Sequence, residues 1–329
     1  MSALAPTLEA FFTERLLRQR DASPHTVAAY RDTMRLLLRF TQRRTRRQPS
    51  ELDLADLDAP LVAAFLDHLE QERGNSVRTR NARLAAIHSL FRYAALRHPE
   101  HAALIGRVLA IPAKRFDRAL VSFLTEPEIE ALLANPERST WTGRRDHALL
   151  LLALETGLRA GELTGLLCGD VHLGVGAHVS CRGKGRKQRV TPLARPTQAV
   201  LRAWLSERDG EAPDPLFPSR QGRRLSRDAL ERRLAKHLLS AAGRAPTLGE
   251  KKVTLHVLRH TAAMRLLQAG VDTSVIALWL GHESVETTQI YLHADLALKE
   301  RALSRTTPPN STPGRYRPPD SMLAFLEAL

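Results

Sequence analysis

The stretch Thr125-Glu126-Pro127-Glu128 divides the chain into two parts of different character. A threonine followed three residues later by a glutamate is a capping box, and proline is favoured in the first turn of a helix. The stretch therefore predicts that a new helix, and with it a new domain, begins here. We expect a mainly α protein with a small antiparallel β-sheet, built from a helical N-terminal domain and a second, larger domain.

Before this boundary, the first hundred residues show helical periodicity interrupted by cap and turn signals. Ser23-Pro24, for example, pairs an N-cap residue with a proline at the first helical position. Four helices are predicted, at about residues 8–20, 24–47, 59–73 and 77–96. A single basic run is usually a solvated helix face, but several in one small module favour a DNA-binding domain.

Basic residues and Pro112 between the two domains indicate a linker. Two short β signals, at 178–181 and 189–192, flank a Gly/Lys/Arg turn and predict a hairpin, with helix over most of the remaining chain to about residue 303. The tail combines a Pro-rich spacer with a short apolar segment at 322–326. We therefore expect four regions: an N-terminal domain (1–110), a basic linker (111–124), a second domain (125–305) and a tail (306–329).

The composition points to nucleic acid as the first partner to consider, because 49 Lys and Arg outnumber 35 Asp and Glu and leave a net charge of +14. A ribosome-like structural protein and an Arg-rich proteome are the alternatives. Only two cysteines occur, Cys168 and Cys181, which suggests neither a zinc site nor a secreted scaffold and fits a reducing cytosol. The longest apolar run, 148–154, is far too short for a membrane span. We expect a cytoplasmic protein.

Arg159 follows the glycine break of Thr156-Gly157-Leu158-Arg159 at the start of a predicted helix. An arginine there can direct its guanidinium at a phosphate, with help from the helix N-terminus. Local pairing with Glu162, three residues on, is the alternative.

The turn at residues 182–189 is strongly basic and contains Lys184. It is not a nucleotide-hydrolase phosphate loop, because His178 stands where that motif needs glycine and Gly185 where it needs Ser or Thr. Two interpretations remain open: a hairpin tip directed toward DNA, or an ordinary solvated turn.

His256-Val257-Leu258-Arg259-His260 places two histidines on one helix face, but Val257 occupies the place where a metalloprotease needs glutamate. Histidine and arginine together suit phosphoryl chemistry, although a core role for His260 is an alternative. Leu280-Gly281-His282 follows, and then Tyr291 on an expected short helix. A lone tyrosine is more often a core or interface residue.

In order and local context, these elements resemble the active-site set of the tyrosine recombinases of the phage-integrase class. Ser23 to Tyr30 also resembles the core-binding, SAM-like domain of that family, so that the resemblance covers about residues 7 to 303. The matching site residues are Arg159, Lys184, His256, Arg259, His282 and Tyr291.

The resemblance implies that Tyr291 attacks the scissile phosphate, forming a 3′-phosphotyrosyl link and freeing a 5′-hydroxyl. Arg159 and Arg259 would bind the non-bridging oxygens, each contributing about 2.7–4 kcal/mol if they act like oxyanion donors. His256 is then the expected proton acceptor and Lys184 the proton donor to the leaving oxygen. His282 would hydrogen-bond the phosphate, with His260 and Glu162 in support. No metal, ATP or other cofactor is expected.

The resemblance further implies that the two domains close round double-stranded DNA as a clamp and that four protomers assemble on two sites, with related recombinases as further partners. The expected process is integration, excision or resolution, in a phage, a transposon, an integron or a chromosome-dimer system. A type IB topoisomerase shares the chemistry and is one alternative. A non-enzymatic DNA-binding factor is the other, and the complete residue set argues against it.

Overall fold

The structure is a computed structural model that describes residues 4–116, 121–183, 188–282 and 286–294. It divides into two compact units, Met1–Ala119 and Leu120–Leu329. Lys184 and the tail at 306–329 lie outside the described residues, as does the linker segment 117–120.

The first unit is helical throughout its described part. Its elements are α1 (Leu4–Ala10), the π-helical η1 (Phe11–Gln19), α2 (Pro24–Thr45), η2 (Pro49–Glu51), η3 (Leu54–Asp56), α3 (Ala59–Gln71), α4 (Val77–Ala95), η4 (Pro99–His101) and α5 (Ala102–Leu109). The four predicted helices are therefore confirmed, with α1 and η1 together forming the first. Helix α5 was not predicted.

Local signals explain where these helices begin. The hydroxyl of Ser23 accepts a hydrogen bond from the Thr26 amide (3.3 Å), and Ser76 does the same for Thr79 (3.3 Å). Such caps satisfy amide groups that the first helical turn leaves without partners. The apolar faces of the helices then meet in a core of their own, in which Phe65 and Phe91 are almost fully buried.

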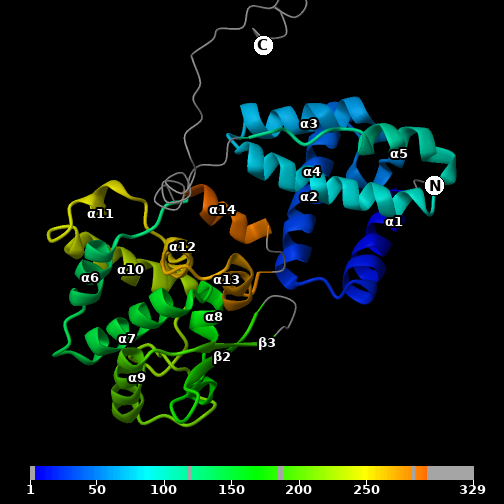
Figure 1. The fold of residues 1–329 in the computed structure, drawn as a ribbon. Coiled ribbons are helices and arrows are strands. Elements are labelled where there is room, and N and C mark those ends of the chain that lie inside the picture. Colours follow the sequence, from blue (N-terminus) through cyan, green and yellow to red (C-terminus); the bar gives the residue numbers. More distant parts are fainter. Residues whose placement is uncertain (1–3, 117–120, 184–187, 283–285, 295–329) are drawn as a thin grey trace, which may run out of the picture. The chain divides into compact units, whose positions relative to one another are not determined.

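The second unit combines helices with a small sheet (Figure 1). Its elements are α6 (Glu126–Ala134), α7 (Trp141–Thr156), α8 (Ala160–Gly165), η5 (Cys168–Asp170), β1 (Val171–His172), β2 (His178–Arg182), β3 (Gln188–Pro192), α9 (Arg195–Arg208), α10 (Arg227–Ala241), α11 (Thr247–Glu250), α12 (Leu255–Gln268), α13 (Thr273–Leu280) and α14 (Glu286–Ala294).

The strands form an antiparallel sheet in the order β1-β2-β3. Strands β2 and β3 run side by side, with Cys181 opposite Arg189 and Arg182 opposite Gln188. The predicted hairpin is thus confirmed. The two-residue strand β1 was not predicted, since two residues are too few for an alternating pattern.

The predicted capping box is present at the start of α6, where the amide of Thr125 donates to Oε2 of Glu128 (2.8 Å). Glu128 is buried and also accepts from Thr247 Oγ1 (2.6 Å) and Lys251 Nζ (2.7 Å). These bonds hold the pKa of Glu128 below its ordinary value despite burial, which alone would raise it. The residue that caps α6 therefore also joins it to α11.

Helix α7 is buried along most of its length and packs against α12. This packing brings the residues that follow α7 next to the first turns of α12: Arg259 on α12 donates from Nη1 to the carbonyl of Gly157, at 2.7 Å. Two of the expected site motifs, about a hundred residues apart in sequence, are therefore neighbours.

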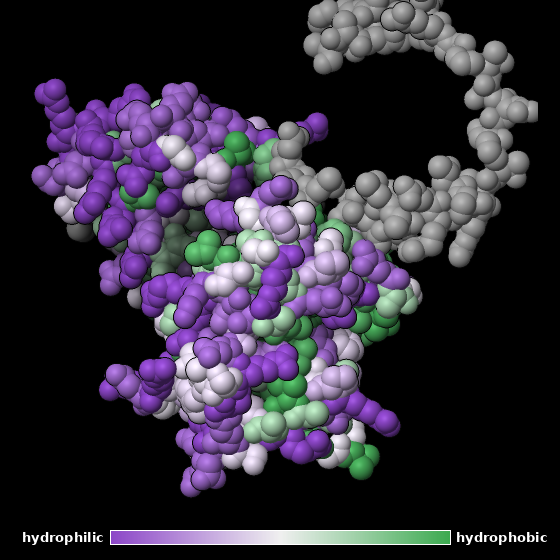
Figure 2. All heavy atoms as spheres, turned by 90° about the vertical axis from the view of Figure 1, so that its left-hand side faces the viewer, coloured by the Kyte–Doolittle hydropathy of each residue, from purple (hydrophilic) through white to green (hydrophobic). Residues whose placement is uncertain are grey.

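On the face shown in Figure 2, hydrophilic side chains cover most of the placed surface. Among the described residues, no helix is long and apolar enough to cross a membrane.

Candidate active site

Arg159 lies between the end of α7 and the start of α8. Gly157 ends α7 in the left-handed conformation (φ 61°), and Arg159 is the N-cap of α8. The backbone amide of Arg159 donates to Oε2 of Glu162 (2.7 Å), and its Nη1 donates to Oε1 of the same carboxylate (2.9 Å). Glu162 is buried, whereas the side chain of Arg159 is 38% exposed. The local pairing of Arg159 with Glu162, which was the alternative interpretation of the sequence, is thus present. The guanidinium of Arg159 nevertheless reaches the surface.

The C-terminal end of α13 receives three arginines. Consecutive carbonyls of residues 279, 280 and 281 each accept a bond from a different guanidinium: Trp279 from Arg189 (2.7 Å), Leu280 from Arg259 (2.6 Å) and Gly281 from Arg159 (3.1 Å). The last carbonyls of a helix have no partners within it and carry the negative end of the helix dipole. The end of α13 is therefore a natural anchor for cationic side chains.

This cluster is positively charged overall. The carboxylate of Glu162 accepts bonds from the guanidinium groups of Arg159 and Arg189, and Arg259 lies close enough to interact with its charge; these four groups carry three positive charges and one negative charge, or +2. Desolvation, and next the charges of the nearby Arg159 and Arg189, lower the pKa of Arg259 to about 10. With a pKa of about 10, Arg259 is still cationic at neutral pH, so the cluster favours an anionic ligand.

Tyr291, on α14, is 1% exposed. Its hydroxyl is hydrogen-bonded with Nδ1 of His260 on α12, at 3.0 Å. Burial raises the pKa of the phenol to about 12, although Arg259 and Arg159 oppose this shift. The hydroxyl therefore remains protonated at neutral pH and needs a proton acceptor before it can act as a nucleophile.

His282 follows the end of α13 and is hydrogen-bonded through Nδ1 with Thr288 Oγ1 (2.8 Å). Its ring stacks on that of Tyr291, with centroids 6.4 Å apart. Desolvation and then the charges of Arg259 and Arg159 lower its pKa to about 4. His282 is thus neutral at pH 7 and acts as a hydrogen-bonding group, not as a cation.

His256 is exposed on the same helix face as His260, with the two ring centroids 4.1 Å apart. Desolvation, and next the neighbouring His256, lower the pKa of His260 to about 4. The histidine that is hydrogen-bonded with the phenol hydroxyl is His260, which sequence reasoning had placed in a supporting role.

The structure gathers five of the six expected residues in the second unit, namely Arg159, His256, Arg259, His282 and Tyr291, and the sixth, Lys184, is outside the described residues. Sequence reasoning did not single out Arg189 or Thr288. Arg189 shares a strand face with Thr191, but the burial of Thr191 is seen only in the structure, so the sequence carried no clear signal for Arg189. Among the described residues, no group of three or more metal-binding side chains was found.

A buried tyrosine beside neutral histidines and surplus guanidinium groups has the chemistry that phosphoryl transfer to a tyrosine hydroxyl requires. Residues 122–297 match the Phage integrase family, and residues 10–98 match the Phage integrase, N-terminal SAM-like domain. The chain belongs to the phage integrase family of tyrosine recombinases, which confirms the resemblance. It is an enzyme that cleaves and rejoins DNA strands in site-specific recombination.

Several relatives span nearly the same length. The integrase/recombinase y4rC of Sinorhizobium fredii is 59% identical, over 100% of this chain and 99% of the relative. The tyrosine recombinase XerC of Xylella fastidiosa is 36% identical, over 84% and 88% respectively. Among solved structures, the XerH recombinase bound to difH in a pre-cleavage complex is 25% identical with a TM-score of 0.64, covering 87% of this chain and 81% of that one.

The Tn1549 transposon integrase in complex with transposon right end DNA has a TM-score of 0.66 at 16% identity, over 89% of this chain and 98% of that chain. At this identity the likeness concerns the fold. It agrees with the expected fold class, a mainly α protein with a small antiparallel sheet.

Proposed function

We propose that Tyr291 is the nucleophile of this recombinase and that Arg159 and Arg259 bind the scissile phosphate. The observation that carries this assignment is the net charge of +2 in the arginine cluster, beside a buried tyrosine. Among the described residues, each of the two arginines uses two of its five side-chain N–H donors on protein groups, which leaves donors for a phosphate. Guanidinium groups fixed in advance stabilise the charge that grows on the phosphate oxygens.

His256 is the proposed proton acceptor for the phenol, and His260 holds the phenol in its buried position before the reaction. The 3.0 Å contact with His260 and the 4.1 Å ring separation of the two histidines support a short path for the proton. His282 would hydrogen-bond the phosphate; its neutral ring and its bond with Thr288 support this role. Lys184 would protonate the leaving 5′-oxygen, a role that rests on its motif alone.

The partner is double-stranded DNA carrying a recombination site. We propose that the two domains close round it, that four protomers assemble on two such sites, as the family resemblance implies, and that the reaction takes place in the cytoplasm. The proposed domain limits are 1–110 and 125–305, joined by the basic linker 111–124, with the tail at 306–329. A core site would consist of short inverted repeats around a spacer, sought in the DNA that flanks the gene.

The assignment of Tyr291 is tested by covalent trapping on a nicked duplex that contains this core site, recovered if necessary from a random duplex library. Cleavage next to the nick releases a short strand, so that the phosphotyrosyl adduct accumulates. Tyr291→Phe should bind the duplex as the unchanged protein does and form no adduct, since it lacks only the hydroxyl.

Tyr30→Phe is the matched control, because Tyr30 lies in the first unit and stacks on Phe11. It should form the adduct at the normal rate. An adduct formed by Tyr291→Phe would remove Tyr291 from the mechanism.

A further inference from the structure

Arg189 contacts three elements at once. It lies on β3 opposite Cys181 of β2. Its Nη2 donates to Oε2 of Glu162 (2.7 Å), its Nη1 to the carbonyl of Trp279 (2.7 Å) and its Nε to Sγ of Cys181 (3.1 Å). Its side chain is 11% exposed. Arg189 is therefore neither a hairpin tip directed toward DNA nor part of a solvated turn.

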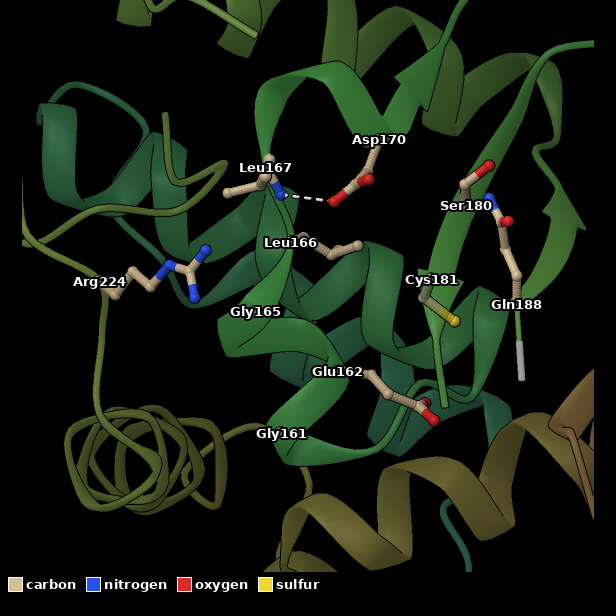
Figure 3. A pocket seen from close by; sticks show the side chains of 10 residues that line it. All are labelled: Gly161, Glu162, Gly165, Leu166, Leu167, Asp170, Ser180, Cys181, Gln188 and Arg224. Atoms are coloured by element: carbon tan, nitrogen blue, oxygen red, sulfur yellow. Dashed lines mark hydrogen bonds between the residues drawn. The ribbon is translucent and has the colours of Figure 1, made fainter. Parts of the chain in front are cut away.

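Glu162 is shared between two arginines. Oε1 accepts from Arg159 Nη1, while Oε2 accepts from Arg189 Nη2 as well as from the backbone amide of Arg159. Figure 3 shows the side chain of Glu162 extending from α8 toward the strand that carries Cys181, at one end of a cavity of about 460 Å³. Without Arg189, the full charge of the buried carboxylate would fall on Arg159, and the two groups could pair through both oxygens. The guanidinium of Arg159 would then be less available to a phosphate.

Arg189 also supports the turn that leads to His282. It donates to the Trp279 carbonyl, and the next two carbonyls along the chain, those of residues 280 and 281, accept from Arg259 and Arg159. Gly281 has φ 63°, and a Cβ there would meet Cδ of Arg189 at 3.1 Å, so the arginine stem lies directly against this turn. One side chain therefore connects β3, Glu162 and the end of α13.

We propose that Arg189 is a positioning residue for the scissile phosphate: by sharing Glu162 it keeps the guanidinium of Arg159 available to the non-bridging oxygens. The proposal rests on the proposed function, because it takes Arg159 to be a phosphate ligand. Arg189 itself acts through Arg159 and not by contact with the reacting atoms.

The test compares two nicked duplexes with the same core site, one with an ordinary scissile phosphate and one with a neutral methylphosphonate in its place. Replacing one non-bridging oxygen by methyl removes the negative charge, so that cleavage depends less on correctly directed guanidinium groups. Arg189→Lys keeps the charge, but one ammonium group cannot reproduce a planar contact with three partners. At saturating DNA we expect it to cleave the phosphate duplex about 10–100-fold more slowly, by analogy with the loss seen when a group that supports a metal ligand is removed. DNA affinity should change little.

On the methylphosphonate duplex, most of the loss in Arg189→Lys should disappear, as it should for Arg159→Ala. Arg202→Ala is the control, since exposed Arg202 on α9 also donates to a backbone carbonyl, that of Leu173 at 3.1 Å. It should cleave both duplexes like the unchanged protein. An equal loss in Arg189→Lys on both duplexes would mean general structural damage and overturn the proposal.

Glu162→Gln combined with Arg189→Lys provides a second route if Arg189→Lys alone does not fold, as judged by its thermal unfolding. The amide keeps the shape of the side chain but removes the charge that would otherwise hold Arg159, so the double variant should cleave the phosphate duplex at about the rate of Glu162→Gln alone. A double variant that cleaves much more slowly than Glu162→Gln alone would overturn the proposal. Tyr291→Phe is measured in the same series: an adduct formed by that variant would overturn the proposed function instead, whatever the result for Arg189.

Discussion

Tyr291 and His260 form a contact whose strength depends on the charge of the histidine. Burial disfavours the protonated imidazole, and with the neighbouring His256 and Arg259 it lowers the pKa of His260 to about 4. His282 behaves similarly. In the unfolded chain a histidine titrates near its reference pKa of about 6.5. Between these values the unfolded state binds more protons than the folded state.

The second unit should therefore lose stability as the pH falls from about 6.5 toward 4, with the contribution fully present only above about 6.5. His260→Gln, which can still hydrogen-bond the phenol, should reduce this dependence by up to about 1.4 kcal/mol per pH unit, the value for one proton. The measurement is urea unfolding at pH 5 and pH 7 followed by tryptophan fluorescence, because Trp141, Trp204 and Trp279 all lie in the second unit.

His172→Gln is a suitable control, since His172 is exposed on β1 of the same unit. It should leave the pH dependence nearly unchanged. If His260→Gln is as sensitive to pH as the unchanged protein, His260 is not the source of the effect.

At the level of elements, the end of α7 depends on a glycine. Gly157 has φ 61°, and a Cβ there would meet Leu280 Cδ2 at 2.6 Å. Leu280 is the last residue of α13, whose carbonyl accepts a bond from Arg259. The close approach of α7, α12 and α13 at this point therefore requires a residue without a side chain.

Gly157→Ala should lower the free energy of unfolding of the second unit by about 1–3 kcal/mol, through left-handed backbone strain and overpacking. Strand cleavage should also slow, because Arg259 donates to the carbonyl of residue 157. Gly161→Ala is the control: its Cβ would meet nothing within 4 Å. Urea midpoints from tryptophan fluorescence compare the two, and equal midpoints would contradict the packing argument.

Element boundaries were largely predictable from short sequence signals. Ser23-Pro24 and the capping box at residues 125–128 begin helices as expected, because caps depend on atoms within one helical turn. The short helix α5 and the two-residue β1 were missed. Segments of this size carry too little periodicity, and packing against neighbouring elements determines their conformation.

At the scale of the whole molecule, the role of the tail, residues 306–329, is predicted from the sequence alone. An apolar segment, 322–326, follows the Pro-rich spacer at 306–319. So short a segment cannot form a core alone and should dock on another surface. Because C-terminal segments in this family often pack on a neighbouring protomer, we expect the tail to link assembly to cleavage.

Deletion of residues 306–329 should leave binding to a single core site intact and impair synapsis or the coordination of cleavage. Gel-shift titration and a two-site recombination assay measure the two steps separately. Leu323→Gln with Phe325→Gln keeps the length of the tail and should reproduce the defect. Unchanged recombination by the truncated protein would show that the tail is dispensable.

The order of the motifs determined the family, because Arg159, His256, Arg259, His282 and Tyr291 each stand in a short local context that can be read directly. The pairing of these residues was decided only by the tertiary structure. Arg159 reaches a carbonyl 122 positions away, and Arg259 reaches one 102 positions away. Such contacts exist because α7 packs on α12 and the end of α13 lies against both, and no local signal encodes the distance between helices.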